Sequence, residues 1–259
     1  MAPARARLDR GGALVTGGAR RIGRALALTL ADAGYAVAVH YRSSAADAAA
    51  LVAEIEAAGG RAAAIRADLS REPETAGLVA AARQAVGPLT LLVNNASVFE
   101  TDSAGSLDRA VWDAHMEANL RAPLVLSQAF AAQAPEGESA DPLILNLLDQ
   151  RVLRPHPQFF SYTVSKAALW TATRMLAQAF APRVRVNGIG PGPTLANTVQ
   201  GEHGLAAEAA AVPLGRRTTL DDITRAARYL IDARAVTGQM IAVDGGQHLA
   251  WKTPDIQGD

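Results

Sequence analysis

The sequence contains no cysteine, which excludes disulfide bonds, thiolate metal sites and cysteine nucleophiles together. It has no surplus of either charge, because 25 Lys and Arg are balanced by 25 Asp and Glu. Binding to nucleic acid or to an anionic membrane surface is therefore disfavoured. No apolar run reaches the roughly 18 residues of a membrane span, and residues 1–10 carry charge where a signal peptide needs an apolar core. We expect a cytoplasmic protein without nucleic acid or membrane partners.

What is present indicates one large globular domain over residues 1–259. The chain is 49% hydrophobic and 19% charged, which suits an extensive core. Short aliphatic runs alternate with longer Ala-rich stretches of helical periodicity, as in an α/β, doubly wound parallel sheet with helices on both faces. The expected strands are Ala13–Val15, Ala36–Tyr41, Ala62–Arg66, Leu89–Val93, Leu143–Leu148, Val184–Ile189 and Met240–Val243. The expected helices are 21–33, 45–58, 72–86, 107–133, 160–180 and 221–232.

Two connections between these elements differ in composition from the rest. Residues 134–142 are rich in Pro, Glu, Gly and Ser, which predicts an exposed connection before the fifth strand. From Pro191 to Arg217 the chain contains much Gly, Pro and Ala with weak periodicity. Because a long connection at this place in an α/β sheet is often mobile, we expect a substrate lid at about 193–217.

A glycine-rich turn at residues 16–23, Thr-Gly-Gly-Ala-Arg-Arg-Ile-Gly, follows the first strand and opens the first helix. Such a turn can bring backbone N–H groups and a helix N-terminus against a pyrophosphate. The alternative is an ordinary strand-to-helix turn that binds nothing. The candidate cofactor contacts in this turn are Gly17, Arg20, Arg21, Ile22 and Gly23.

The second strand ends in His40-Tyr41-Arg42-Ser43-Ser44, without the acid that commonly binds the adenosine ribose of NAD. Arg42 and the hydroxyls could instead hold a 2′-phosphate, with guanidinium donors added from the glycine-rich turn. The alternative is that these arginines form a solvated face. The sequence favours NADP(H), with cofactor contacts at His40, Tyr41, Arg42 and Ser43.

The helix expected at 160–180 begins with Ser161-Tyr162-Thr163-Val164-Ser165-Lys166. The i, i+4 spacing places the phenol of Tyr162 and the ammonium of Lys166 on one face. A nearby cation and a positively charged nicotinamide ring would favour the phenolate and lower the pKa of Tyr162 from its usual value of about 10. Tyr162 could then relay a proton. The alternative is a surface tyrosine packed along a lysine stem.

Together these motifs resemble the short-chain dehydrogenase/reductase family from about Gly12 to Ala250. Further matches are Ala67-Asp68-Leu69, Asn94-Asn95-Ala96, Asn119, Asn187 before Pro191-Gly192, and Val243-Asp244-Gly245-Gly246. The resemblance implies a Rossmann-like fold of about seven strands, hydride transfer, and a homotetramer with two-fold axes.

The resemblance also implies roles for individual residues. Asp68 and Leu69 would flank the adenine, and Asn94 and Ala96 would lie along the cofactor. Asn119 would hold a water linked to Lys166, and the lysine would bond the nicotinamide ribose while lowering the pKa of the tyrosine. Pro191 and Gly192 would back the nicotinamide.

A departure from the family pattern bears on the substrate. The position thirteen residues before Tyr162, usually a serine, is Asp149. An ionised carboxylate there would repel the oxyanion that develops when hydride attacks a ketone. It suits a nitrogen heterocycle, because it can hydrogen-bond or protonate a ring nitrogen as hydride adds to the adjacent carbon of a C=N bond. The alternative is that Asp149 caps a turn or pairs with Arg151 or Arg154.

Two more departures agree with this interpretation. Arg21 replaces the middle glycine of the usual turn, and Ser97 replaces the usual glycine and is followed by Val98-Phe99. The set is similar to pteridine reductases and bacterial dihydromonapterin reductases. That resemblance implies that Phe99 stacks on the pterin against the nicotinamide. It also implies that Ser97 contacts the ligand or a cofactor phosphate and that Arg21 reaches the pyrophosphate and could reach the pterin. Phe99 could instead be a loop residue closing the core.

The sequence therefore predicts an NADPH-dependent reductase of a C=N bond in a small, pterin-like heterocycle. The expected catalytic residues are Asp149, Tyr162, Lys166 and Asn119. The expected substrate contacts are Ser97, Phe99, Asp149 and Tyr162. No histidine spacing suggests a metal site, so no metal is expected, and the histidines other than His40 are expected at the surface or in loops. The alternatives are a ketone, alcohol or 3-oxoacyl substrate within the same family, and a dinucleotide-binding sensor without turnover.

Overall fold

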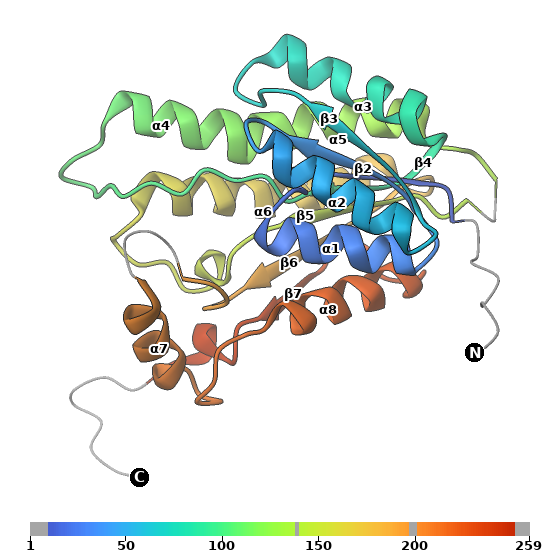
Figure 1. Ribbon diagram of the computed structural model, residues 1–259. Coiled ribbons are helices and arrows are strands. Elements are labelled where there is room, and N and C mark those ends of the chain that lie inside the picture. Colours follow the sequence, from blue (N-terminus) through green and yellow to red (C-terminus); the bar gives the residue numbers. More distant parts are fainter. Residues whose placement is uncertain (1–9, 138–139, 197–200, 252–259) are drawn as a thin grey trace, which may run out of the picture.

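A computed structural model describes residues 10–137, 140–196 and 201–251, which form a central sheet between two layers of helices (Figure 1). Seven strands lie in the order β3-β2-β1-β4-β5-β6-β7, and every neighbouring pair is parallel. The predicted doubly wound α/β sheet is confirmed. The strands are β1 (Gly12–Val15), β2 (Ala36–Tyr41), β3 (Arg61–Arg66), β4 (Leu89–Asn94), β5 (Leu143–Leu147), β6 (Arg185–Pro191) and β7 (Met240–Val243).

The two helical layers follow from strands that are buried on both faces. In β1, Ala13 and Val15 belong to one apolar cluster and Leu14 to another on the opposite face. The first cluster is completed by α1 (Arg21–Asp32), α2 (Ala45–Ala57) and α8 (Leu220–Asp232). The second is completed by α3 (Glu72–Val86), α5 (Ala122–Gln133) and α6 (Phe160–Phe180). Each layer therefore has its own core.

Two helical regions differ from the prediction. The helix expected over 107–133 is divided into α4 (Arg109–Met116), a π-helical turn η1 (Glu117–Arg121) and α5. In the region expected to be an irregular lid, the structure contains helix α7 (Gly201–Ala211), which the weak periodicity did not reveal. Residues 197–200 of that region, and 138–139 of the connection before β5, lie outside the described residues.

The strand order places a crevice at the carboxyl ends of β1 and β4, where the chain crosses from one half of the sheet to the other. Side-chain amides fix the neighbouring strands there. Asn94 of β4 and Asn146 of β5 are register partners, and Asn94 Nδ2 donates to Asn146 Oδ1 at 2.9 Å. Asn146 Nδ2 in turn donates to Thr173 Oγ1 of α6 at 2.9 Å. This buried chain aligns the helix that carries Tyr162 with the centre of the sheet.

Among the described residues, no helix combines the length and apolar character needed to cross a membrane.

Candidate active site

A cavity of about 770 Å³ opens along the carboxyl ends of the strands. It brings together nearly all of the predicted site residues, although they come from many separate elements. Those lining it are Gly17, Arg20, Arg21, Ile22, Gly23, His40, Tyr41, Arg42, Ser43, Asp68, Leu69, Ala96, Ser97, Phe99, Asp149, Tyr162, Lys166, Pro191 and Gly192. Two predicted residues, Asn94 and Asn119, are buried outside this lining.

The glycine-rich turn is built for close backbone approach. Gly17 has a φ of +58°, and a Cβ added to Gly23 would lie 2.2 Å from the carbonyl oxygen of Gly17. Only glycine therefore lets α1 start this close to the end of β1. The side chain of Asn95 braces the turn by donating from Nδ2 to the carbonyl oxygens of Thr16 at 2.8 Å and Gly17 at 3.1 Å. Asn95 also lines the cavity, a role that sequence reasoning missed.

His40 of β2 supports the same turn through a hydrogen bond. Gly17 N donates to His40 Nδ1 at 3.0 Å, and His40 Nε2 lies 3.1 Å from the carbonyl oxygen of Ala67. Because Nδ1 must accept, the proton lies on Nε2, which donates to Ala67. Burial lowers the pKa of His40, which keeps the ring neutral. The residue therefore acts on the turn as well as lining the cavity.

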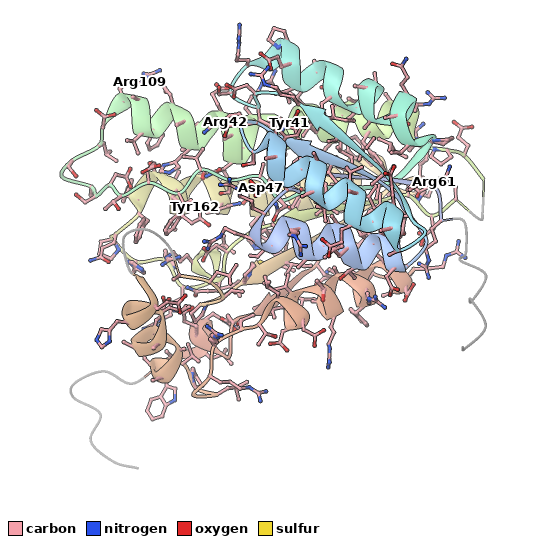
Figure 2. All side chains as sticks on the ribbon, viewed as in Figure 1. Tyr41, Arg42, Asp47, Arg61, Arg109 and Tyr162 are labelled. Carbon is pink, nitrogen blue, oxygen red and sulfur yellow. The ribbon has the colours of Figure 1, made fainter. Side chains whose placement is uncertain are left out.

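The basic residues near the turn have different surroundings. Arg42 directly follows β2 and is exposed. Figure 2 labels it beside Tyr41, the last residue of that strand. Arg20 Nε pairs with Asp47 Oδ2 at 2.6 Å, so its charge is shared with an acid. Arg21 lines the cavity, and its NH1 also donates a hydrogen bond to the carbonyl oxygen of Ala196 at 2.8 Å. Arg21 thereby ties the glycine-rich turn to the segment that precedes α7.

Asp68 and Leu69 lie at the end of β3, on the wall of the cavity. Asp68 Oδ1 accepts hydrogen bonds from Ser70 Oγ at 2.7 Å and Ser70 N at 3.0 Å. These bonds lower the pKa of Asp68, so the carboxylate stays ionised and fixed in place. Leu69 is buried beside it and supplies an apolar surface.

Asp149 faces the tyrosine. Tyr162 Oη donates to Asp149 Oδ2 at 3.0 Å, and Arg151 NH1 lies 3.2 Å from the same oxygen. Asp149 Oδ1 accepts from Arg151 N at 2.8 Å and so caps the short helix η2 (Gln150–Val152). Asp149 therefore caps a turn and pairs with Arg151, as the alternative interpretation expected, and it also lines the cavity.

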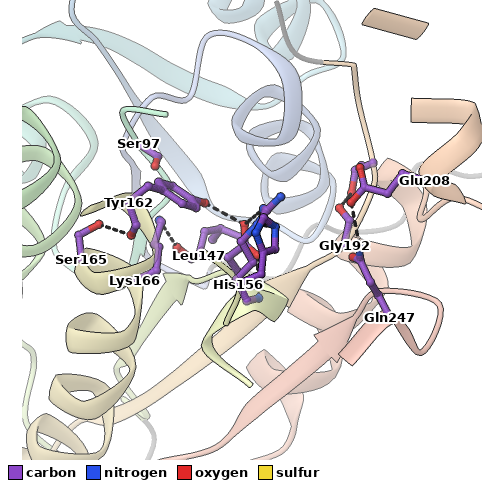
Figure 3. Close-up of polar contacts among 12 residues, drawn as sticks. Ser97, Leu147, His156, Tyr162, Ser165, Lys166, Gly192, Glu208 and Gln247 are labelled. Atoms are coloured by element: carbon purple, nitrogen blue, oxygen red, sulfur yellow. Dashed lines mark hydrogen bonds and ion pairs between the residues drawn. The ribbon is translucent and has the colours of Figure 1, made fainter. Parts of the chain in front are cut away.

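Tyr162 and Lys166 are both buried, and Figure 3 shows them facing the same space. Burial and the neighbouring Asp149 raise the pKa of Tyr162 well above its usual value. The protein groups alone therefore raise this pKa, and the lowering expected when a nicotinamide ring is also present stays a prediction. Burial also lowers the pKa of Lys166 to about 8. Its Nζ donates to the carbonyl oxygen of Leu147 at 2.7 Å and lies 5.9 Å from the centre of the Tyr162 ring.

Asn119 lies in the π-helical turn with its amide fully engaged. Its Oδ1 accepts from Val98 N at 2.8 Å and from Ser97 Oγ at 3.1 Å. Its Nδ2 donates to the carbonyl oxygen of Val98 at 2.9 Å and to Ser165 Oγ at 3.2 Å. The amide therefore holds the segment after β4 against α6. A link from Asn119 through water to Lys166 stays a prediction.

Phe99 forms part of an aromatic group beside the acid. Its ring stacks on Phe159 at 4.4 Å between centroids, and it meets the edge of Tyr162 at 4.6 Å. The guanidinium of Arg151 lies 5.7 Å from the Phe99 ring centre and 5.4 Å from that of Phe159. Phe99 therefore packs its loop against Phe159 and Tyr162, and it also lines the cavity. Arg151, which sequence reasoning considered only as an alternative partner of Asp149, joins these rings to the acid.

One histidine expected at the surface or in a loop is buried beneath the site. His115 is 0% exposed, its Nδ1 lies 2.7 Å from Ser161 Oγ, and its Nε2 accepts from Glu100 N at 3.1 Å. Its position follows from the inward face of α4, which the sequence did not distinguish. Within the described parts of the chain, no cluster of three or more potential ligands could hold a metal ion.

The end of the cavity beyond the acid was missed by sequence reasoning. It is lined by Glu208 of α7, Gln247 of the short helix η3 (Gln247–Leu249) and Gln150 of η2. Gln247 Nε2 donates to Glu208 Oε1 at 2.7 Å (Figure 3). None of these positions belongs to a recognisable motif, so only the fold brings them together.

Comparisons with known proteins agree with this geometry. A family model described as enoyl-(acyl carrier protein) reductase matches residues 17–248. The 3-oxoacyl-[acyl-carrier-protein] reductase FabG of Staphylococcus aureus is 31% identical, covering 92% of this chain and 98% of its own. The structure of FolM alternative dihydrofolate reductase 1 from Brucella canis complexed with NADP has a TM-score of 0.92 and 47% identity, covering 97% of this chain and 99% of that one. A short chain dehydrogenase from Burkholderia cenocepacia in complex with NADP has a TM-score of 0.86 and 36% identity, covering 93% and 99%.

Proposed function

Because the chain belongs to the short-chain dehydrogenase/reductase family, we propose that it is an NADPH-dependent oxidoreductase that transfers hydride to a C=N bond of a pterin-like heterocycle. The residues present fit the dinucleotide. The glycine-rich turn leaves no room for a Cβ at Gly23, and Arg42 is exposed where a 2′-phosphate would lie. The relatives from Brucella and Burkholderia, both crystallised with NADP, support this cofactor.

The observation that carries the choice of substrate is the carboxylate of Asp149, 3.0 Å from the phenol of Tyr162 and inside the cavity. Reduction of a ketone builds negative charge on oxygen, and a carboxylate at this place would oppose it. Reduction of a C=N bond leaves a nitrogen that needs a proton and can bond an acid. The acid therefore suits a ring nitrogen better than a carbonyl oxygen.

The cofactor supplies hydride when it is bound, and the protein residues supply position and protons. Tyr162 stays a neutral phenol because its pKa is raised, so it can donate a proton at neutral pH. Asp149 accepts the phenol hydrogen bond and orients the donor, while Arg151 balances its charge. Lys166 would bond the nicotinamide ribose, and Phe99 would provide a flat wall for the heterocycle. Asn119 accepts a hydrogen bond from Ser97 and so holds the segment that carries Ser97 and Phe99 in place.

The comparisons support two substrate classes. The Brucella structure, named as an alternative dihydrofolate reductase, supports a reduced pterin. The Staphylococcus relative, a 3-oxoacyl reductase, supports the alternative of a ketone or 3-oxoacyl substrate. Asp149 separates them, because a ketone reductase needs a neutral donor where this chain has an acid.

The test follows NADPH absorbance with dihydropterins, dihydrofolate, a panel of ketones and acyl thioesters, and repeats each assay with NADH. We expect the dihydropterins to be reduced fastest and NADPH to be preferred. Faster turnover of ketones or thioesters than of every pterin would overturn the substrate assignment. Failure to oxidise NADPH with any substrate would favour a sensor without turnover.

Three further expectations belong to this proposal. We propose that the protein forms a homotetramer and acts in the cytoplasm, and that residues 193–217 close over the substrate. The exposed side chain of Met175 on α6, 62% accessible, would be covered in such an assembly. Light scattering after size-exclusion chromatography measures the subunit number, and a monomer would refute the assembly.

A further inference from the structure

We propose that Asp102 and His115 are positioning residues, which hold the loop that carries Phe99 against the first turn of the helix that carries Tyr162. Residues 97–102, which follow β4, are called the Phe99 loop below, and Asp102 and His115 are called the clamp. The inference rests on the proposed function, because a heterocycle must meet the Phe99 ring and the Tyr162 phenol together. Neither clamp residue lines the cavity, so both act through their neighbours.

Asp102 supplies the cap that α6 lacks. The N-cap residue of this helix is Phe159, whose side chain cannot accept a hydrogen bond, and the first turn contains no acid. Ser161 N donates to Asp102 Oδ1 and to Oδ2, at 3.1 Å each, and Phe159 N donates to the carbonyl oxygen of Asp102 at 3.0 Å. A carboxylate at a helix N-terminus accepts free N–H groups and interacts favourably with the helix dipole. Asp102 therefore ties the Phe99 loop to the start of α6.

His115 of α4 joins the same two segments. Its Nε2 accepts from Glu100 N at 3.1 Å, so the proton lies on Nδ1, which donates to Ser161 Oγ at 2.7 Å. Burial lowers the pKa of His115, which keeps the ring in the neutral form that both bonds require. The ring therefore links the residue after Phe99 to the residue before Tyr162.

The contacts of His115 repeat those of Asn119, which lies four residues later and about one helical turn away. Each side chain bonds one residue of the Phe99 loop and one serine of α6, in the sets Glu100–His115–Ser161 and Val98–Asn119–Ser165. In the sequence, Phe99 falls between the two loop residues and Tyr162 falls between the two serines. The loop and the helix are thus fixed to each other on both sides of the two residues expected to contact the substrate.

This arrangement sets the position of the aromatic wall relative to the proton donor. The rings of Phe99 and Tyr162 meet edge to face with centroids 4.6 Å apart, and the ring of His115 packs against Tyr162 at 5.9 Å. The heterocycle must lie flat on one group while it receives a proton from the other. Because a shift of about 1 Å between reacting groups can cost about 100-fold in rate, loss of the clamp should slow turnover without removing any group that contacts the substrate.

The first experiment measures the clamp without a substrate, by hydrogen exchange of the backbone amides in the Phe99 loop and in residues 160–165. The variants are Asp102→Ala and His115→Phe, which keeps an aromatic ring. The control is Thr219→Ala, which removes the N-cap of α8, a helix on the opposite face of the sheet from α6. We expect exchange in both segments to rise about tenfold or more in the clamp variants, the effect of one lost buried hydrogen bond, and to stay unchanged in the control. Unchanged exchange in both clamp variants would overturn the clamp.

The second experiment asks whether the clamp serves the reaction. In Asp102→Ala and His115→Phe, kcat/KM for a dihydropterin should fall about tenfold or more, while the NADPH dissociation constant stays within about twofold. His115→Gln, whose amide oxygen can accept from Glu100 N, should recover most of the turnover. Thr219→Ala should lower the unfolding temperature, as loss of a cap does, and keep the turnover of the wild type. Wild-type turnover in clamp variants that exchange faster would overturn the positioning role.

A double-mutant cycle tests whether His115 acts through Phe99. Once the aromatic wall is removed by Phe99→Leu, its placement no longer matters, so adding His115→Phe should lower kcat/KM less than about twofold further. Losses that multiply would overturn the role, because His115 would then act on another group.

These outcomes are distinguishable from a failure of the proposed function. A wild type that reduces a ketone and no dihydropterin would overturn that function, and the same variants are then compared with the ketone as substrate. Hydrogen exchange decides whether the clamp exists in either case. Thermal unfolding confirms that each variant is folded, and Asp102→Asn, which keeps one acceptor oxygen, replaces Asp102→Ala if the latter does not fold.

Discussion

Replacing Asp149 with Asn is the most direct test of the chemistry. The change removes the negative charge and keeps the size and planar shape of the side chain. An amide oxygen at Oδ1 can still accept from Arg151 N, now 2.8 Å away, so the cap of η2 is retained. At Oδ2, Tyr162 and Arg151 lose a charged acceptor. The variant therefore isolates the charge from the local fold.

The expected size of the effect follows from these contacts. The amide nitrogen at the Oδ2 place cannot accept a hydrogen bond from Tyr162 or Arg151, so each of these contacts to a charged group, which contributes about 1.5–3 kcal/mol, is lost. If Asp149 also takes part in proton delivery, a further factor of about 100 or more is lost. We expect kcat/KM for a dihydropterin to fall at least about 100-fold. NADPH binding should change less than about twofold, since the contacts of Asp149 are to Tyr162 and Arg151.

The charge has a second signature in the tyrosine. Because Asp149 is one of the causes that raise the pKa of Tyr162, its neutralisation should lower that pKa. Absorbance of the phenolate during an alkaline titration reports this change. Turnover is followed by NADPH absorbance and cofactor affinity by NADPH fluorescence.

Asp113→Asn is the matched control, since Asp113 pairs with Arg109 at 2.7 Å on the exposed side of α4, outside the cavity. We expect turnover and affinity to match the wild type. Our reasoning is refuted if Asp149→Asn keeps pterin turnover within about threefold of the wild type, against the factor expected for a proton-transfer group. Equal losses of turnover and NADPH affinity would show that the acid is structural.

Three further predictions concern the cofactor and the buried cation. Gly23→Ala should abolish measurable NADPH binding in fluorescence titrations, because the added Cβ would lie 2.2 Å from the carbonyl oxygen of Gly17. The control Gly77→Ala, whose added Cβ meets nothing within 4 Å, should bind NADPH normally and unfold at a higher temperature. Arg42→Ala should raise the NADPH dissociation constant about 10- to 100-fold and leave that of NADH unchanged; equal effects on both would exclude a 2′-phosphate contact. The pKa of Lys166 is lowered to about 8, so between that pH and 10.5 the unfolded chain binds a proton that the folded one lacks, and stability rises with pH. Urea denaturation should show this rise in the wild type and not in Lys166→Met.

The fold could be predicted where periodicity is strong. Short aliphatic runs predicted all seven strands. In β1, β2, β4, β5 and β6 these runs are buried on both faces, as is usual in parallel sheets, whereas the edge strands β3 and β7 are partly exposed. Helix α7 was missed because Leu205 is its one large aliphatic residue, so its sequence carries no apolar stripe. The π-helical turn was missed because it depends on contacts of Asn119 with Val98 and Ser165, which are distant in the sequence.

The candidate site could be predicted where short motifs fix the spacing. The glycine-rich turn and the Tyr162–Lys166 pair both line the cavity as expected. The direction of the Tyr162 pKa could not be predicted, because it depends on burial and on the orientation of Asp149. The wall formed by Glu208 and Gln247 joins two segments without a motif, and only the packing of α7 and η3 brings them together.

The paired amides of Asn94 and Asn146 also bear on how the chain avoids wrong structures. A slip of β5 by one residue against β4 would turn the side chain of Asn146 to the other face of the sheet and separate it from both Asn94 and Thr173. Each buried amide group left without a partner costs about 1–3 kcal/mol, whereas aliphatic neighbours would tolerate the slip more easily. The amides therefore penalise misregistered sheets during folding, and they do so at the strands on which the cofactor crevice depends.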